Sequence, residues 1–326
     1  MMELYELVLD FLYKNKGKYI PANEIASNIN ISEPELMKTF HKLEKQKYKI
    51  DFDENLGYRL EETPNLLLPY EIKRDLKTEF IGKKIYYFPE VNSTNDVAKE
   101  FAEKGAENGT LIIAQTQRRG KGRNGKKWIS PLGGVWMSII LRPTIKPEKA
   151  PQLTLVTGVA VAETLKKQTG LNVKIKWPND ILIDNKKVCG ILTEAHAKYN
   201  TLDYVIVGIG IDVNMDMELF PQELRKDATS IKEELEMEIY YVELVQRFLE
   251  KFEELYNEFN ADQFPEILRK WRKYSKTIGS YVEIHKKLGK IVRGEAVGIN
   301  KQGALILELD DGTLRKVFSG ECIHLN

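Results

Sequence analysis

The sequence contains few of the residues that build metal sites or disulfide frameworks. Its 326 residues include only two cysteines, Cys189 and Cys322, and four histidines. The cysteines are far apart and show no zinc-type spacing, so neither a structural zinc site nor a set of disulfide bridges is expected. We predict that both cysteines are buried thiols and that the side chains form no metal site.

Long hydrophobic runs and an excess of charge of one sign are also missing. No apolar run reaches the roughly 18 residues of a membrane span, and Glu3, Glu6 and Asp10 stand where a secretory leader would be basic. We therefore expect a cytoplasmic protein with no membrane partner. The 49 Lys and Arg nearly balance 48 Asp and Glu, which excludes a globally basic nucleic-acid coat but leaves a local basic patch open.

The N-terminal part has the pattern of a small helical domain. Apolar residues at helical spacing predict helices over residues 3–13 and 22–29, and Ser32 is a good N-cap for a third helix with Pro34 in its first turn. Alternating apolar residues on both sides of a turn at 53–57 predict a hairpin. Three helices and a hairpin are typical of a winged helix-turn-helix, which we assign to residues 1–62.

The rest of the chain predicts an α+β protein. Two prolines within residues 61–72 indicate a linker. Strand patterns interrupted by at least two helices then predict a mixed α/β domain over residues 63–275. Short strands separated by glycine turns predict a small SH3-like β-barrel over residues 276–326. The strands expected in the central domain are 85–88, 111–117, 135–142, 173–177, 181–183, 188–192 and 204–211.

The densest basic segment is RRGKGRNGKKW, residues 118–128. Its glycines allow backbone N–H groups to approach an anion closely, and its cations neutralise that anion, so the loop suits a phosphate or a carboxylate. A nucleic-acid patch and a solvated basic loop remain open alternatives. The segment is not a P-loop, because Lys127 stands where a Ser or Thr must bind magnesium. The glycines at 208 and 210 do not form a dinucleotide motif, because Val213 occupies the third glycine position.

A second polar cluster is KWPND, residues 176–180. Pro178 must end the strand that precedes it and Asn179-Asp180 turn the chain, which brings a cation, an amide and a carboxylate to one strand end. Taken alone, an ordinary tight turn explains this cluster equally well. Lys187 opens the next strand, where it could simply be solvated, and Gly190 leaves space beside that strand for a ligand.

Three separated motifs occur in one order: NSTN (92–95), Q-x-x-G-K-G-R-x-G (117–125), and KWPND followed by KVCGIL (176–192). Together with VGIGIDVN (207–214), they resemble the catalytic core of biotin protein ligases. The resemblance extends over essentially the whole chain, including both terminal domains. It implies that the central domain is class II synthetase-like.

The resemblance also implies an activity and partners. Such enzymes form biotinyl-5'-AMP from biotin and ATP with Mg²⁺, and then transfer biotin to a lysine of a biotin carboxyl carrier protein of acetyl-CoA carboxylase or a related carboxylase. The bifunctional members are homodimers that bind operator DNA and repress biotin genes.

The matching positions imply specific residues. Lys187 and Arg123 would offset charge at the α-phosphate, and Asp180 would receive the proton of the acceptor lysine. The biotin-binding set would comprise Ser93, Thr94, Asn95, Gln117, Lys121, Gly122, Arg123, Lys187, Gly190, Gly208 and Gly210. The ATP- or adenylate-binding set would comprise Arg123, Trp128, Lys176, Asn179 and Asn214. The DNA-binding set would comprise Ser32, Lys38, His41 and Lys42.

Two departures from the family pattern leave alternatives open. Lys121 replaces an arginine common in relatives, which keeps the charge but loses bidentate geometry. Glu33 and Glu35 lie in the helix turn that should face DNA, where they repel phosphates. The alternatives are a ligase whose winged helix does not bind DNA tightly and a non-catalytic transcription factor that senses a metabolite. A lipoate ligase would share the central fold but not the combination of motifs.

Overall fold

The computed structural model describes residues 3–198, 201–286 and 289–325. The chain divides into two compact units, Met1–Leu66 and Leu67–Asn326. The division falls inside the proline-containing segment 61–72 that the sequence indicates as a linker.

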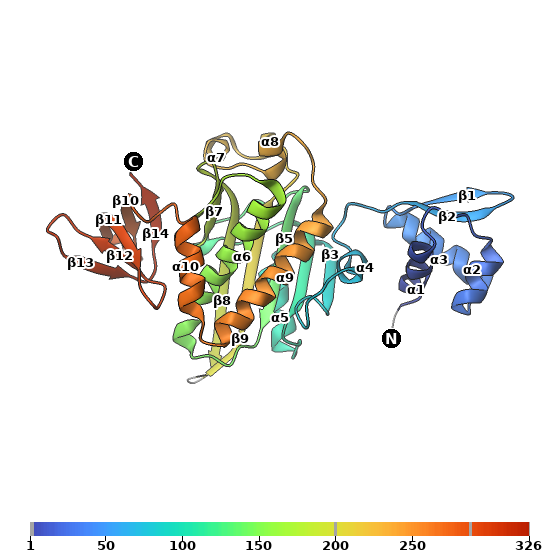
Figure 1. The fold of residues 1–326 in the computed structure, drawn as a ribbon, viewed down its shortest axis with the longest axis horizontal. Coiled ribbons are helices and arrows are strands. Elements are labelled where there is room, and N and C mark those ends of the chain that lie inside the picture. Colours follow the sequence, from blue (N-terminus) through green and yellow to red (C-terminus); the bar gives the residue numbers. More distant parts are fainter. Residues whose placement is uncertain (1–2, 199–200, 287–288, 326) are drawn as a thin grey trace. The chain divides into compact units, whose positions relative to one another are not determined.

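The N-terminal unit consists of three helices followed by an antiparallel hairpin (Figure 1). Its elements are α1 (Leu4–Lys14), α2 (Ala22–Ile29), α3 (Glu33–Lys45), β1 (Lys49–Asp53) and β2 (Gly57–Glu62). Helix α3 begins with a capping box, in which Ser32 Oγ accepts the Glu35 N–H and the Glu35 carboxylate accepts the Ser32 N–H. Val8, Leu9 and Leu36 are fully buried in the core of this unit. The three helices and the hairpin expected from the sequence are thus confirmed.

The second unit is built on a seven-stranded sheet with the strand order β3-β4-β5-β9-β8-β7-β6. Strands β3 and β4 are parallel, and the other neighbouring pairs are antiparallel. The strands are β3 (Ile85–Val91), β4 (Thr110–Gln117), β5 (Gly134–Leu141), β6 (Val173–Lys176), β7 (Asp180–Ile183), β8 (Lys186–Lys198) and β9 (Thr201–Asp212).

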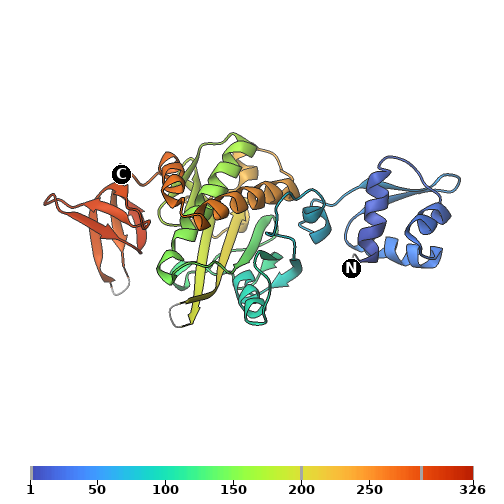
Figure 2. The same ribbon diagram turned by 60° about the horizontal axis from the view of Figure 1, so that its bottom comes forward.

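The two faces of this sheet are covered differently. Helices α6 (Gln152–Thr169), α9 (Tyr241–Asn260) and α10 (Phe264–Tyr274) cover one face and form the main core with it (Figure 1, Figure 2). Helix α5 (Thr94–Glu103) packs against β4, β5 and β9 in a separate apolar cluster. Side chains alternate between the faces of a strand, so Val205 and Val207 join the main core while Ile206 joins the α5 cluster. Gly208 and Gly210 follow Ile206 on the α5 side, where the absence of a side chain leaves space for Asn95 and Trp128.

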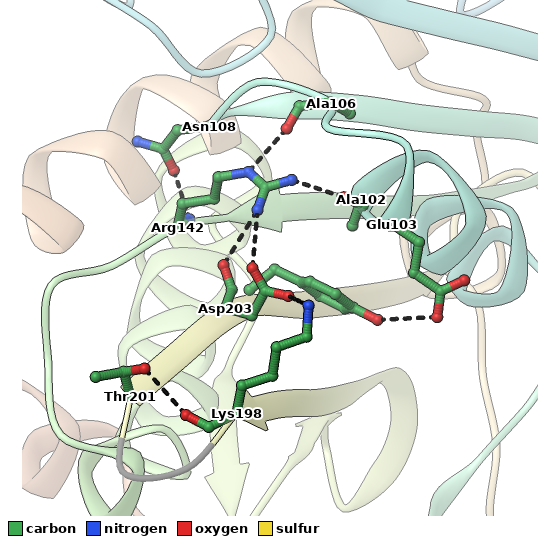
Figure 3. A network of polar contacts seen from close by, with 9 residues as sticks. Ala102, Glu103, Ala106, Asn108, Arg142, Lys198, Thr201 and Asp203 are labelled. Atoms are coloured by element: carbon green, nitrogen blue, oxygen red, sulfur yellow. Dashed lines mark hydrogen bonds and ion pairs between the residues drawn. The ribbon is translucent and has the colours of Figure 1, made fainter.

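Helix α5 is fixed at its C-terminal end by Arg142, which follows β5 (Figure 3). The guanidinium group donates to the carbonyl oxygens of Ala102 at 2.7 Å, Ala106 at 2.9 Å and Asp203 at 3.1 Å. A cation is favourable at a helix C-terminus because the last carbonyl groups have no partners within the helix. Arg142 thereby joins the end of α5 to β5 and to the start of β9.

The C-terminal part of the second unit is an antiparallel sheet with the order β13-β12-β11-β10-β14. Its strands are β10 (Tyr281–His285), β11 (Ile291–Ile299), β12 (Leu305–Glu308), β13 (Leu314–Val317) and β14 (Glu321–His324). Strand β14 was not expected from the sequence. The remaining short α-helices of the described part of this unit are α4 (Pro69–Arg74), α7 (Gln222–Arg225) and α8 (Ile231–Leu235).

Two predictions about composition can be compared with the structure. Cys189 and Cys322 are both free and buried, as predicted, and burial raises the pKa of the Cys322 thiol to about 12. Within the described ranges, no helix combines the length and apolar character needed to cross a bilayer.

Candidate active site

A cavity of about 280 Å³ opens on the α5 side of the seven-stranded sheet. It brings together residues from four motifs that lie between residues 92 and 214 of the chain. The predicted residues that line it are Ser93, Thr94, Asn95, Gln117, Lys121, Gly122, Arg123, Trp128, Asn179, Asp180, Lys187, Gly190, Gly208 and Gly210.

Three glycines form part of the cavity wall because no side chain fits there. Gly190 of β8 stands opposite Gly210 of β9 in the sheet register. A Cβ atom on either glycine would meet the Trp128 ring, and a Cβ atom on Gly208 would meet the Asn95 amide. These glycines therefore let the Trp128 indole and the Asn95 amide lie directly on the sheet backbone.

One end of the cavity carries neutral polar groups. Gln117 Oε1 accepts hydrogen bonds from the Thr94 N–H at 2.7 Å and from Thr94 Oγ1 at 3.2 Å, and Gln117 Nε2 donates to Ser130 Oγ at 2.8 Å. These bonds fix the direction of the Gln117 amide, since its oxygen faces two donors. In the described part of the chain, its second N–H hydrogen stays available to a ligand.

The other end of the cavity carries charged groups. Lys187 Nζ lies 2.7 Å from Asp180 Oδ1 and 5.0 Å from the centre of the Trp128 ring. Arg123 donates to Asn179 Oδ1 at 2.9 Å and to the Gly320 carbonyl oxygen at 3.2 Å. Burial lowers the pKa of Arg123, and the nearby carboxylates Asp180 and Glu321 oppose this shift. Two cations therefore line this end of the cavity, and the Asp180 carboxylate pairs with Lys187.

Ion pairs attach the glycine-rich loop to its surroundings. Lys121 pairs with Asp96 in the first turn of α5, and Lys126 pairs with Glu321 of β14. With the Arg123 contact to Gly320, these pairs position the loop beside the cavity from both the helix and the C-terminal sheet.

Asp212 lines the cavity but was not predicted from the sequence. It is 2% exposed, and its Oδ1 atom has no hydrogen-bond partner among the described residues. Burial raises the pKa of Asp212 well above its usual value, and only the charge of Lys187 opposes the shift. Its position two residues after Gly210 places it on the same face of β9, so strand alternation could have indicated it.

Ser138 is a second residue that the sequence did not indicate. It is fully buried on β5, and its hydroxyl lies 2.8 Å from Thr94 Oγ1 and 2.6 Å from Asn95 Oδ1. Only the register of β5 beside β9, which pairs Ser138 with Gly208, places this hydroxyl beneath the cavity.

Two residues of the predicted ATP set lie outside the cavity lining. Lys176 pairs with Asp180 in the β6–β7 register. The Asn214 amide donates to the Ile239 carbonyl oxygen at 2.9 Å and accepts from the Ile239 N–H at 3.0 Å. The contacts of Asn214 thus support the chain around Ile239, and a nucleotide role for either residue stays a prediction.

The predicted DNA-binding residues lie in the N-terminal unit. Lys38, His41 and Lys42 are exposed along α3, and Ser32 is exposed at its start, where it caps the helix. No group of three or more His, Cys, Asp or Glu side chains suitable for a metal occurs in the ranges that the structure describes.

The chain matches known protein families and solved structures. Residues 87–212 match the Biotin/lipoate A/B protein ligase family, and residues 277–325 match the Biotin protein ligase C terminal domain. The solved biotin protein ligase from Aquifex aeolicus in complex with biotin and ATP has a TM-score of 0.64 at 30% identity, covering 74% of this chain and 98% of that one.

Two bifunctional relatives are similar to this chain over most of its length. The chain is 37% identical over 312 residues to the bifunctional ligase/repressor BirA of Bacillus subtilis, covering 95% of each protein. It is 30% identical over 267 residues to the bifunctional ligase/repressor BirA of Escherichia coli, covering 81% of this chain and 80% of that protein. The chain belongs to the biotin protein ligase family, and the resemblance inferred from its motifs is confirmed.

Proposed function

We propose that this protein activates biotin with ATP and transfers it to a lysine of a carrier protein. The observation that carries the proposal is one cavity with two chemically different ends. Thr94, Asn95 and Gln117 offer hydrogen-bond donors and acceptors suited to a cyclic urea, and Lys187 and Arg123 offer cations suited to a carboxylate and a phosphate. Biotin has a urea at one end and a carboxylate at the other.

In the first step, an oxygen of the biotin carboxylate attacks the α-phosphorus of ATP, and pyrophosphate leaves. Lys187 and Arg123 offset the negative charge that gathers at the α-phosphate, which is the electrostatic mode of catalysis. Ser93, Lys121 and Gly122 complete the wall around biotin, and Trp128 and Asn179 contact the adenylate. Magnesium would be held by the ATP phosphates, several waters and one or two carboxylates, as this ion prefers.

In the second step, the neutral amine of the carrier lysine attacks the carbonyl carbon of biotinyl-AMP, and AMP leaves. The amine must lose a proton as the amide bond forms. Asp180 lines the cavity beside Lys187, which supports its assignment as the carboxylate that accepts that proton. The acceptor is a biotin carboxyl carrier protein of acetyl-CoA carboxylase or a related carboxylase.

The direct test of this activity is biotin-dependent exchange of labelled pyrophosphate into ATP. The first step is reversible, so we expect label in ATP only when biotin is present. Absence of exchange with the purified full chain, or exchange that does not require biotin, would refute the ligase proposal and favour a metabolite-sensing transcription factor.

A second function, repression of biotin genes, is supported by the N-terminal unit. We infer that residues 1–62 form a winged helix-turn-helix, with α3 presenting Lys38, His41 and Lys42 to operator DNA. The relatives from Bacillus subtilis and Escherichia coli carry the name bifunctional ligase/repressor. Homodimer formation would match the two-fold symmetry of an operator.

The chain that follows the winged helix-turn-helix comprises two further domains. We propose a catalytic domain over residues 63–275 and a C-terminal domain over 276–326. The five short antiparallel strands β10–β14 support an SH3-like assignment of the C-terminal domain by size and strand order.

A further inference from the structure

The direction of the Asn95 amide is decided by two neighbours on β8. Asn95 Nδ2 donates to Glu194 Oε2 at 2.6 Å and lies 3.5 Å from the Leu192 carbonyl oxygen. A carboxylate and a carbonyl group only accept hydrogen bonds. A reversed amide would place its oxygen against both acceptors, so the NH₂ group must face β8.

The oxygen of the same amide consequently faces the cavity wall at Gly208. Ser138 Oγ donates to Asn95 Oδ1 at 2.6 Å from the buried side. A carbonyl oxygen has two lone pairs, so Asn95 Oδ1 can accept one further hydrogen from a ligand. Asn95 is 5% exposed and lines the cavity.

The neighbouring Gln117 has the opposite polarity. Its oxygen is engaged by Thr94, and its amide nitrogen faces Ser130 with one hydrogen to spare. The cavity end thus offers an acceptor from Asn95 and a donor from Gln117. A cyclic urea presents N–H donors beside a C=O acceptor and matches this arrangement, whereas a reversed Asn95 amide would place N–H against N–H.

We propose that Glu194 is a positioning residue that fixes the polarity of the urea-binding end of the cavity through Asn95. Glu194 is exposed and does not line the cavity, so it acts on Asn95 and not on the ligand. The proposal rests on the proposed function, because it assigns the urea of biotin to this end.

The first test is Glu194→Gln in the full chain. A glutamine amide can turn either its oxygen or its nitrogen to Asn95, so only the weak contact with the Leu192 carbonyl oxygen, at 3.5 Å, still favours one orientation of the Asn95 amide. We expect the KM for biotin in pyrophosphate exchange to rise about tenfold, as for loss of a hydrogen bond to a charged group. The KM for ATP and the Tm should not change. Glu295→Gln, at an exposed glutamate of β11, is the matched control.

The second test exchanges donor and acceptor. Asn95→Asp alone brings two carboxylates together and should raise the KM for biotin further. In the double variant Asn95→Asp/Glu194→Gln, the glutamine amide donates to the new carboxylate, whose other oxygen faces the cavity. We expect the double variant to bind biotin within about threefold of the original protein.

Several results would overturn the proposal. These are an unchanged KM for biotin in Glu194→Gln, an equal rise in the KM for ATP, a parallel fall in Tm, and no recovery in the double variant. If the unmodified protein shows no biotin-dependent exchange, the proposed function itself fails, and this result is distinct from exchange that is insensitive to Glu194.

Discussion

The glycines of the cavity wall are the residues at which a single methyl group should matter most. A Cβ atom on Gly208 would overlap the Asn95 amide. Because Asn95 is buried against Ser138 and Glu194, it cannot move aside without losing hydrogen bonds.

We therefore predict that Gly208→Ala raises the KM for biotin by at least about tenfold, measured by pyrophosphate exchange. Gly298→Ala is the control, since its added Cβ would meet no atom within 4 Å. Equal kinetics for the two variants would show that the wall at Gly208 is not part of the binding site.

Asp212 should lower stability at neutral pH in the absence of ligand. The folded protein raises the pKa of this carboxyl, with burial as the main cause and Lys187 opposing it. The unfolded chain then loses the Asp212 proton at a lower pH than the folded protein does. This difference lowers the free energy of unfolding. The loss is absent below the pKa of Asp212 in the unfolded chain, about 3.9, and grows as the pH rises towards its pKa in the folded protein.

Asp212→Asn should accordingly raise the free energy of unfolding by about 1–3 kcal/mol at pH 8, because it replaces a buried carboxylate by a neutral amide. The gain should be much smaller at pH 4. Calorimetry at both pH values measures this, with Asp184→Asn, at an exposed aspartate, as control. If the gain in unfolding free energy is the same at pH 4 and pH 8, the pKa of Asp212 is not raised in the folded protein.

At the scale of elements, helix α5 carries residues of the cavity at one end and a contact that stabilises the fold at the other. Its first turn carries Thr94 and Asn95, and its last turn is bound by Arg142. Because three carbonyl groups each lose one hydrogen-bond donor when Arg142 is removed, Arg142→Met should destabilise the protein by about 3 kcal/mol.

This loss is measured by chemical denaturation, and amide exchange should become faster near Ala102. Arg315→Met, at an exposed arginine of β13, provides the control. If Arg142→Met is no less stable than this control, the Arg142 contacts do not hold the helix.

Elements with strong alternation or helical spacing could be predicted from the sequence. Strands β5 and β9 are rich in Val and Ile, and α9 carries a clear apolar stripe. Helix α5 was not predicted as a helix, because its buried face is made partly of Ala98 and Ala102, which are weakly apolar. Strand β14 (Glu321–His324) has its apolar residues Cys322 and Ile323 side by side, so it shows no alternation.

The site was predictable only where residues lie in motifs. Asn95, Gln117, Arg123 and Lys187 belong to such motifs and meet in the cavity. Ser138 and Glu194 lie on strands β5 and β8, and only sheet register brings them to Asn95. Register depends on long-range pairing, which local patterns do not encode.

At the scale of the whole molecule, DNA binding and ligation should be separable. The DNA-binding side chains lie in the unit Met1–Leu66, and the cavity lies in Leu67–Asn326. Reversing two charges on α3, with Lys38→Glu and Lys42→Glu, places acidic groups where phosphates would bind.

We predict that this double variant loses binding to biotin-promoter DNA in a gel shift with biotinyl-AMP present. The loss should be at least about tenfold, and pyrophosphate exchange should keep its normal rate. If the unmodified protein shows no promoter binding either, Glu33 and Glu35 offer the physical reason, and the chain is a ligase that does not bind DNA tightly.

Lys187 is the cation on which the proposed activation of biotin depends most. The decisive measurement is biotin-dependent pyrophosphate exchange by Lys187→Ala, compared with Lys186→Ala, whose exposed side chain precedes it on β8. We predict that Lys187→Ala reduces exchange by at least about a hundredfold while Lys186→Ala keeps the normal rate. Similar exchange rates in the two variants would contradict the assignment of this cavity as the site of biotin activation.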